Sequence, residues 1–142
     1  ILQEEETDLT KIEDMNGLTL LGKSEATFSG LETFPNRNPQ RNYTVTLTTD
    51  EFTCVCPLTG QPDFARITIT YVPDQRIVES KSLKLYFFTY RNRGVFHEHA
   101  ANLILTDLVK VLEPRWCRVE ADFGVRGGIA IRVSAQHGVP PQ

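Results

Sequence analysis

The order of hydrophobic periods along the chain constrains its fold more than any other feature. Residues 43–48 and 67–71 alternate apolar and polar side chains with the period of two that is typical of half-buried strands. Two stretches of helical spacing follow, and two more alternating segments, 118–123 and 129–134, come last. This order predicts an α+β domain with an antiparallel sheet and two helices on one face. It excludes a doubly wound Rossmann fold, which alternates strands with helices.

Glycine and proline mark the boundaries of the two expected helices. The spacing predicts a first helix over residues 80–91, ended by Gly94, and a second from about Phe96 to Leu112, stopped by Pro114. Each helix carries apolar residues at the spacing that places them on one face. Both helices are therefore expected to pack against the sheet.

The same two residue types predict where the chain turns or becomes irregular. Residues 33–41 and 52–64 contain several prolines, and we expect both to be loops. Pro73 and Asp74 predict a turn before the first helix, and Gly127–Gly128 predicts the hairpin between the last two strands.

Composition limits the organisation of the chain and its partners. The 142 residues are expected to form one domain over 33–142, preceded by an acidic and partly mobile extension over 1–32. A net charge of −3 argues against a protein that coats nucleic acid or an anionic membrane. The sequence shows neither a long apolar run nor a signal-peptide pattern, so we expect a cytoplasmic location.

A thiol and a carboxylate in the proline-rich loop suggest covalent catalysis. Cys56 precedes Pro57, and Asp63 follows seven positions later, with Gly60 allowing the chain between them to fold back. A thiolate is a nucleophile, and a nearby acid can supply the proton that an attacked multiple bond takes up. The structural alternative is a packed cysteine and an aspartate in a turn.

The other two cysteines of the chain are predicted to be structural. Cys54 and Cys117 lie at strand positions among apolar neighbours, which is typical of a buried and unreactive thiol. The odd total of three and the C-x-C spacing favour reduced thiols over a disulfide or a zinc motif.

The segment His97, Glu98 and His99 at the start of the second helix has three interpretations. A metal site is not favoured, because neither H-x-x-x-H nor paired C-x-x-C accompanies it. Glu98 could stabilise the helix dipole, or its carboxylate could accept two hydrogen bonds from the N–H edge of a guanine-like base.

Three cations lie near the ends of predicted elements. Lys81, Lys84 and Arg126 are either solvated surface residues or the ligands of an anion. The 2′-phosphate of a nicotinamide cofactor is the natural candidate for such an anion.

Four separated motifs occur in the order FTCVCPLTGQPDFA, VESKSLKLYFFTYRN, FHE and RGGI. Together they resemble the short, one-domain form of the NADPH-dependent 7-cyano-7-deazaguanine reductases, the nitrile reductases of queuosine biosynthesis, a tRNA modification. The resemblance covers residues 33–138. It implies the tunnelling fold, a ββααββ unit that oligomerises into barrels, and a decamer of two stacked pentamers with sites between subunits.

The resemblance also implies a role for each motif residue. Cys56 is expected to add to the nitrile carbon as a covalent thioimide, with Asp63 protonating the nitrile nitrogen. Residues that recognise the deazaguanine or line its pocket are expected to be Glu98, His97, Glu79 and Ser80. Residues that contact the phosphates of NADPH are expected to be Lys81, Lys84 and, beside them, Arg126. Some relatives carry a cysteine that could protect the nucleophile as a disulfide, and Ala100 at that place excludes the pairing here.

Other functions are compatible with parts of this pattern. Amidine-forming relatives share the thiol loop but use ammonia, and they are expected to lack the ESKSLK segment that is present here. A GTP cyclohydrolase of the tunnelling fold would need zinc ligands for which the chain has no counterpart. A purine-binding module without catalysis would bind the base and leave NADPH unused.

Overall fold

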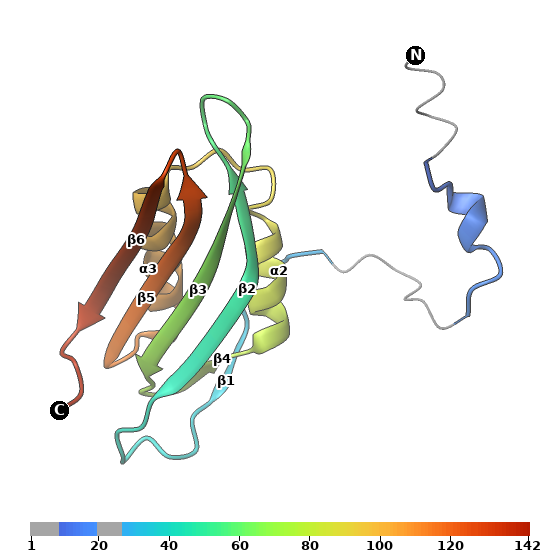
Figure 1. Cartoon of the computed structure of the whole chain (residues 1–142). Coiled ribbons are helices and arrows are strands. Elements are labelled where there is room, and N and C mark those ends of the chain that lie inside the picture. Colours follow the sequence, from blue (N-terminus) through green and yellow to red (C-terminus); the bar gives the residue numbers. More distant parts are fainter. Residues whose placement is uncertain (1–8, 20–26) are drawn as a thin grey trace.

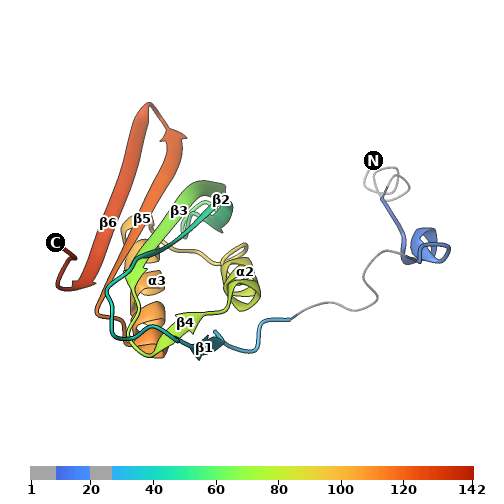
Figure 2. The ribbon, with the colours of Figure 1, turned by 90° about the horizontal axis from the view of Figure 1, so that it is seen from below.

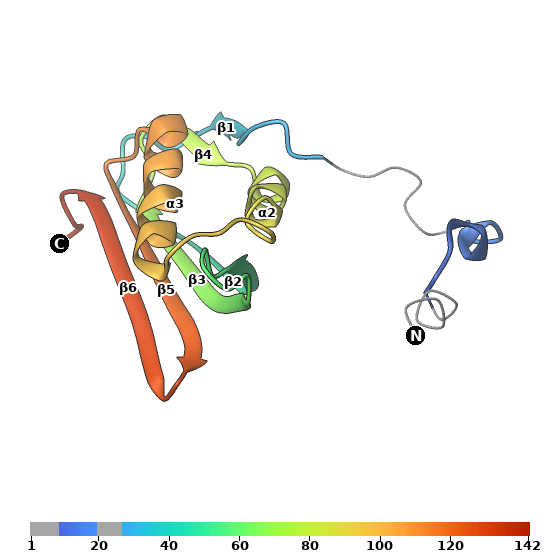
Figure 3. The same ribbon diagram turned by 90° about the horizontal axis from the view of Figure 1, so that it is seen from above.

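A computed structural model describes residues 9–19 and 27–142 of the chain (Figure 1). Its elements are the 3₁₀ helix η1 (Ile12–Met15), β1 (Thr33–Pro35), β2 (Val45–Val55), β3 (Pro62–Val72), β4 (Arg76–Val78), α2 (Ser80–Phe88), α3 (His97–Leu112), β5 (Trp116–Arg126) and β6 (Ile129–Gly138). The main sheet is antiparallel with the strand order β2-β3-β5-β6, and β1 pairs with β4 in a separate two-stranded sheet. Figures 2 and 3 show α2 and α3 on the same face of the main sheet. The predicted α+β class and its element order are confirmed.

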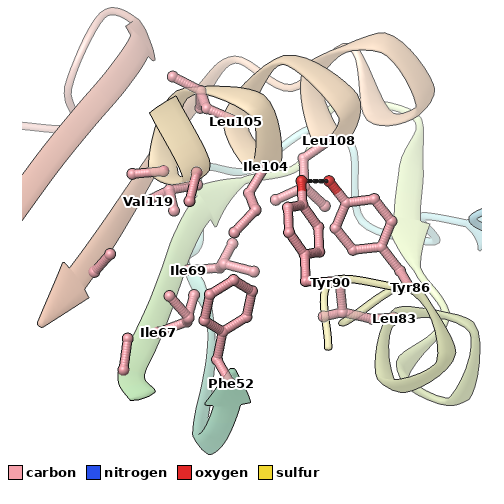
Figure 4. Close-up of a cluster of buried hydrophobic side chains, with 14 of the residues drawn as sticks. Phe52, Ile67, Ile69, Leu83, Tyr86, Tyr90, Ile104, Leu105, Leu108 and Val119 are labelled. Atoms are coloured by element: carbon pink, nitrogen blue, oxygen red, sulfur yellow. Dashed lines mark hydrogen bonds between the residues drawn. The ribbon is translucent and has the colours of Figure 1, made fainter. Parts of the chain in front are cut away.

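The core lies between the helices and one face of the main sheet (Figure 4). Along β3, buried residues such as Ile67 and Ile69 alternate with more exposed threonines, as the period of two predicts. Each fully buried aliphatic or aromatic side chain contributes about 1.5–3 kcal/mol to folding. The largest of them are Tyr71, Tyr90, Phe52, Ile67, Ile69, Ile104, Leu108 and Leu112.

A hydrogen-bonded pair of tyrosines joins the two helices inside this core. The hydroxyl of Tyr86 donates to Oδ2 of Asp107 on α3 at 2.6 Å and lies 2.9 Å from the hydroxyl of Tyr90. Figure 4 shows both rings side by side beneath α3. Because buried hydroxyls are costly without partners, this network fixes the position of α2 against α3.

The two central strands extend further than the sequence predicts. Residues 52–64 were expected to form a loop, but β2 continues to Val55 and β3 begins at Pro62, so that only residues 56–61 connect them. A bulge between Thr49 and Phe52 shifts the register of β2 against β3. Side chains that face the core are normally two residues apart along a strand, but Thr49 and Phe52 are three residues apart. Because the alternation is interrupted at the bulge, the sequence pattern did not predict the second half of β2.

Two further expectations are wrong. Within 33–41, Thr33–Pro35 forms β1 and pairs with β4, whose three residues were also not expected as a strand. A strand of three residues is too short to show the alternation of apolar and polar side chains by which strands are predicted. The first helix ends at Phe88, three residues before the expected Arg91, and Gly94 does not cap it but forms a bridge with Val55 of β2.

The remaining boundaries agree with the sequence. Helix α3 starts one residue after Phe96 and ends at Leu112, where Glu113 takes the left-handed conformation with φ 46° ahead of Pro114. Gly127 and Gly128, with φ 56° and 79°, form the hairpin between β5 and β6. Within residues 9–19 and 27–142, no helix is both long enough and apolar enough to cross a lipid bilayer.

The predicted N-terminal extension lies partly outside the described residues, which omit 1–8 and 20–26. Its described part includes η1, where the carboxylate of Asp14 accepts a hydrogen bond from the backbone N–H of Lys11 at 2.8 Å. Closer to the domain, the ring of Phe28 packs edge-on against Tyr86 at 5.8 Å. The division of the chain at residue 33 stays a prediction.

Candidate active site

A tight turn at residues 56–61 presents Cys56 at the end of β2. The backbone N–H of Cys56 donates to the carbonyl of Gln61 at 2.8 Å, and the N–H of Gly60 donates to the carbonyl of Cys56 at 2.9 Å. Gly60 has φ +72°, a left-handed conformation that favours glycine. The fold-back predicted at Gly60 is therefore present, and it holds the backbone of Cys56 in place from both sides.

Asp63 lies just after this turn, and its buried carboxylate contacts two basic side chains. Its side chain is 3% exposed, with Oδ1 2.7 Å from Nη1 of Arg126 and Oδ2 3.2 Å from Nε2 of His97. The contact with Arg126 is an ion pair whose angles fall outside those of a hydrogen bond. Burial of an unpaired carboxylate costs on the order of several kcal/mol. The two basic partners of Asp63 offset this cost.

His97, the first residue of α3, is held between this carboxylate and an aromatic ring. Its ring stacks on Phe123 of β5 with the centroids 3.8 Å apart and the planes 5° from parallel. With Nε2 directed to Asp63, Nδ1 is buried and has no hydrogen-bond partner within the described part of the chain. That atom is available to a bound molecule.

The three cysteines differ sharply in their acidity. Hydrogen bonds from the Thr59 side chain, then from the backbone N–H groups of Thr59 and Leu58, lower the pKa of Cys56 to about 7, with a smaller contribution from Arg126. Burial raises the pKa of Cys54 to about 11 and that of Cys117 to about 12. Cys56 is thus the thiol with a large thiolate fraction near neutral pH.

Gln61 belongs to this site, although sequence reasoning did not identify it. Its Oε1 accepts a hydrogen bond from Nη2 of Arg126 at 2.7 Å, while its carbonyl holds the N–H of Cys56. Arg126 therefore connects Asp63 with the Cys56 turn. The signal in the sequence is weak, because glutamine is common in loops and only its place two residues before Asp63 is suggestive.

Glu98 and His99 are exposed, and neither is in an ion pair or hydrogen bond with Asp63 among the described residues. Glu98 is exposed in the first turn of α3, where only its backbone carbonyl is engaged, by the side chain of Asn102 at 2.8 Å. The ring of His99 packs edge-on against Phe96 at 5.9 Å. In the part of the chain that the structure describes, no three histidine, cysteine or acidic side chains are grouped closely enough to hold a metal ion.

At the start of α2, Glu79 is the cap of the helix. Its Oε1 accepts from the N–H of Lys81 at 2.8 Å and its Oε2 from the N–H of Ser82 at 2.6 Å. These two backbone bonds lower the pKa of Glu79. The carboxylate is therefore engaged in its own helix, and the two N–H groups that it accepts from are not free to bind an anion.

The two lysines are exposed on different sides of this helix start. Ser80 and Lys84 line a groove of about 220 Å³ between α2 and β2, whose other walls are mostly apolar. Lys81 and Glu79 line a second groove of about 270 Å³ beside Thr27 and Gly30. Figure 1 shows the start of α2 near β4, at the opposite end of the sheet from the turn that carries Cys56.

Four of the predicted site residues therefore lie together within a single chain: Cys56, Asp63, His97 and Arg126. The lysines and Glu79 lie elsewhere. Arg126, expected beside the lysines, contacts Asp63 and Gln61 instead, because the β5–β6 hairpin carries it to the Cys56 end of the sheet.

Several known proteins are similar to this chain in sequence, and a solved structure is similar to it in fold. Residues 62–142 match the family described as QueF-like protein. A protein of Syntrophus aciditrophicus named NADPH-dependent 7-cyano-7-deazaguanine reductase is 60% identical over 92% of this chain and 94% of its own length. Proteins of the same name from Thermomicrobium roseum and Exiguobacterium sibiricum are 61% and 49% identical over 75% and 90% of this chain, and over 84% and 83% of their own lengths.

A solved structure is similar to about two thirds of the chain. The archaeosine synthase QueF-Like in its apo form superimposes with a TM-score of 0.64 over 69% of this chain and 96% of its own, at 24% identity. At that identity the similarity concerns the fold alone, and it agrees with the predicted tunnelling fold.

Proposed function

We propose that this chain, which belongs to the family of NADPH-dependent 7-cyano-7-deazaguanine reductases, reduces the nitrile of 7-cyano-7-deazaguanine to a primary amine. The family consists of oxidoreductases, and the proposed product is 7-aminomethyl-7-deazaguanine, a precursor in queuosine tRNA modification. The observation that carries the proposal for this chain is that the acidic Cys56 thiol and the buried Asp63 share Arg126 as a neighbour. A nitrile is a weak electrophile, and this pair supplies what its activation needs.

Cys56 begins the reaction as a thiolate. Its sulfur forms a C–S bond with the nitrile carbon, and one π pair of the C≡N bond moves to nitrogen. Asp63, in its acid form, gives that nitrogen a proton and is left as a carboxylate. The product is a thioimide with a C=N bond that a hydride can reduce.

Asp63 must be protonated before each such step. His97 is the group in contact with its second oxygen, at 3.2 Å, and is thus positioned to pass a proton to it. Arg126 lies 2.7 Å from the other oxygen and is positioned to balance the negative charge that the transfer leaves on Asp63. The two basic neighbours therefore support opposite halves of the proton cycle.

The exposed lysines fit the phosphates of the cofactor. Lys81 and Lys84 are cations without an acidic partner among the described residues, whereas the helix N–H groups beside them are already taken by Glu79. We assign the phosphate contacts to the two ammonium groups, and Ser80 to the wall of the groove that Lys84 lines. NADPH, when bound, supplies the two hydrides that each nitrile requires.

Cys56 also acts as the leaving group. Once the carbon has accepted one hydride, the C–S bond breaks, its electron pair returns to sulfur, and an imine remains. A thiol with a pKa of about 7 is a good leaving group for this step. The second reduction adds one hydride to carbon and one proton to nitrogen, so the overall reaction takes up two hydrides and two protons.

Base recognition is assigned to the start of α3. The exposed carboxylate of Glu98 can accept two hydrogen bonds from the N–H edge of the deazaguanine, and the buried Nδ1 of His97 has no other partner in the described chain. The carboxylate of Glu79 is engaged in the cap of α2. We therefore assign Glu79 to the wall of the substrate pocket, without a side-chain hydrogen bond to the base.

A second copy of the chain would complete the site. Lys81 lies in the first turn of α2, whose start is at the opposite end of the sheet from the Cys56 turn, and Lys84 lies further along the helix beside the middle of β2. Strands β2 and β6 are the two edges of the main sheet. We propose a ring-built homo-oligomer, a decamer of two pentamers, that brings α2 of one subunit to Cys56 of another. Light scattering that returned an active species of 16.1 kDa would contradict this assembly.

The experiment that tests the function follows the absorbance of reduced nicotinamide after the cyano base is added. We expect two NADPH molecules to be oxidised for each base, and mass spectrometry to identify the amine. Reversible binding of the base without NADPH oxidation would favour a purine-binding module. An amidine formed from ammonia would favour the other enzymatic alternative, against which the reductase names of the relatives argue.

A further inference from the structure

We infer that Gly94 is a positioning residue for the Cys56 nucleophile, because its missing side chain lets the α2–α3 connection support the turn at Pro57. The inference rests on the proposed function only in treating Cys56 as the nucleophile. It concerns a residue outside the thiol loop, 38 positions further along the chain than Cys56.

The steric observation is a close approach between two backbone segments. A Cβ atom at Gly94 would lie 3.0 Å from Cα of Pro57 and 3.3 Å from its Cβ, both nearer than ordinary van der Waals contact. The φ angle of Gly94 lies outside the left-handed region, so the requirement is for space and not for an unusual conformation. Gly17 and Gly124, the other described glycines of this kind, have no neighbour closer than 3.7 Å to such an atom.

The segment around Gly94 is bound to the strand that ends in Cys56. The N–H of Val55 donates to the carbonyl of Arg93, and the N–H of Val95 donates to the carbonyl of Val55, both at 3.1 Å. These two bonds flank Gly94 and hold it against the first residue after Cys56. Any displacement of Pro57 is therefore transmitted to the nucleophile within one peptide bond.

The other side of the segment is fixed to the core. The guanidinium of Arg93 lies 5.0 Å from the centre of the Tyr90 ring, and Tyr90 is fully buried and bonded to Tyr86. The connection between α2 and α3 is therefore held by β2 on one side and by Tyr90 on the other. A methyl group at position 94 requires a shift of a few tenths of an ångström, and we expect Pro57, in the exposed turn, to make it because Arg93 and Val95 are hydrogen-bonded to Val55.

Movement of Pro57 would separate the Cys56 sulfur from the groups that make it acidic. Those groups are the Thr59 hydroxyl, the N–H groups of the turn and Arg126. The other titratable or charged groups around the turn are Asp63 and His97, which contact each other, and Arg93 in the supporting segment. With its hydrogen bonds lengthened, the thiol should approach the ordinary cysteine pKa of about 8.5.

The test is the pH profile of Cys56 alkylation by iodoacetamide, followed by intact mass. Cys54 and Cys117 are fully buried, so the native protein reports on Cys56. In Gly94→Ala we expect alkylation at pH 7 to be about tenfold slower than in the wild type, since the thiolate fraction falls from about half to a few per cent. Above about pH 9.5 the two rates should converge. We also expect a lower kcat with little change in the KM for the base.

Matched variants separate positioning from general destabilisation. Gly17→Ala and Gly124→Ala add the same methyl group where space is available, and their alkylation profiles should match the wild type. Pro57→Gly, which removes the supported ring and leaves Gly94 in place, should shift the profile in the same direction as Gly94→Ala. This variant decides the question if Gly94→Ala does not fold.

An unshifted profile in a folded Gly94→Ala, or in Pro57→Gly should the first variant not fold, would overturn the inference. So would an equal shift in Gly17→Ala or Gly124→Ala. A failure of the proposed function has a different signature: alkylation profiles as described here, together with no oxidation of NADPH by the wild type.

Discussion

The two ends of the sheet handle charge in opposite ways. At the Cys56 end, the carboxylate of Asp63 is buried and contacts both Arg126 and His97 within one chain. At the α2 end, Lys81 and Lys84 are exposed, and the nearby carboxylate of Glu79 is occupied with the helix cap. At the Cys56 end the carboxylate has basic partners within the chain, and the buried Nδ1 of His97 is left without one among the described residues. At the α2 end the two ammonium groups have no acidic partner among the described residues.

This difference follows from the cost of burying ions. A nucleophile and an acid must keep a fixed geometry to react, and a buried carboxylate is tolerated only when its partners are built around it. Phosphate groups arrive with the cofactor and can be bound by flexible surface cations. In the proposed mechanism, the chain thus preorganises the groups that make and break bonds, and leaves the anion-binding groups to be completed on binding.

Replacement of Cys56 should have the largest effect. Cys56→Ala removes the sulfur that we propose adds to the nitrile carbon, so we expect no covalent adduct and no turnover. Intact-mass measurement with the cyano base and without NADPH detects the adduct in the wild type. Cys54→Ala and Cys117→Ala serve as controls and should both keep it, since those thiols are buried and weakly acidic. An adduct that persists in Cys56→Ala would remove the proposed nucleophile.

Replacement of Asp63 should be the next most severe change. Asp63→Asn keeps the shape of the side chain but cannot deliver a proton, and we expect adduct formation to slow by about 10²–10⁴-fold. Binding of the base should be largely retained, which calorimetry on Cys56→Ala and on the double variant Cys56→Ala/Asp63→Asn measures without chemistry. Unchanged turnover in Asp63→Asn would end its assignment as the acid.

Much of this architecture could be predicted from the sequence, and the exceptions have physical causes. Alternation over β3, β5 and β6 and the apolar stripe of α3 predicted the sheet and its helices, because burial imposes those periods. The bulge between Thr49 and Phe52 breaks the period of β2. Strands of three residues have no period to detect.

Within the site, the sequence predicted the residue types but not all of their contacts. Cys56 and Asp63 share one motif, and a tight turn between them follows from Gly60. Arg126 reaches Gln61 across 65 residues, a pairing that depends on how the β5–β6 hairpin lies beside the turn. The support of Pro57 by Gly94 is likewise set by tertiary packing, which residue spacing does not encode.

The recognition of the base should depend on Glu98. Glu98→Gln replaces one acceptor with a donor, which would face an N–H of the base at a cost of about 1–3 kcal/mol. We therefore expect the affinity for the cyano base to fall about tenfold or more, measured by calorimetry in the absence of NADPH. Equal affinity of the two proteins would move base recognition to another residue.

A pair of charge deletions tests the comparison between the two ends directly. Lys84→Ala should raise the KM for NADPH by up to about tenfold, because a phosphate contact is lost, and should leave the alkylation of Cys56 unchanged. Lys81→Ala should behave in the same way. Arg126→Ala should slow alkylation at pH 7, since it removes a group that lowers the pKa of Cys56.

Added salt should weaken NADPH binding in the wild type and less so in the lysine variants. If Arg126→Ala changed only the KM for NADPH, then Arg126 would belong to the cofactor site, as the family resemblance implies. If Lys84→Ala changed the alkylation of Cys56, the two ends of the sheet would not be independent.

The smallest expected effect is that of Gln61, which touches the reactive groups only through Arg126 and the turn. Gln61→Ala leaves the backbone bond between its carbonyl and Cys56 intact and frees one end of the Arg126 guanidinium, whose other end still contacts Asp63. Arg126 is a minor cause of the acidity of Cys56, so we expect the pKa of that thiol to rise only slightly from about 7. Because the thiolate is the reacting form, alkylation should then be about two- to threefold slower at and below pH 7 and unchanged above pH 9. Gln61→Glu gives Arg126 a charged acceptor in place of a neutral one and should retain the contact. A Gln61→Ala profile as strongly shifted as that of Arg126→Ala would mean that the guanidinium depends on Gln61, and not on Asp63, for its position.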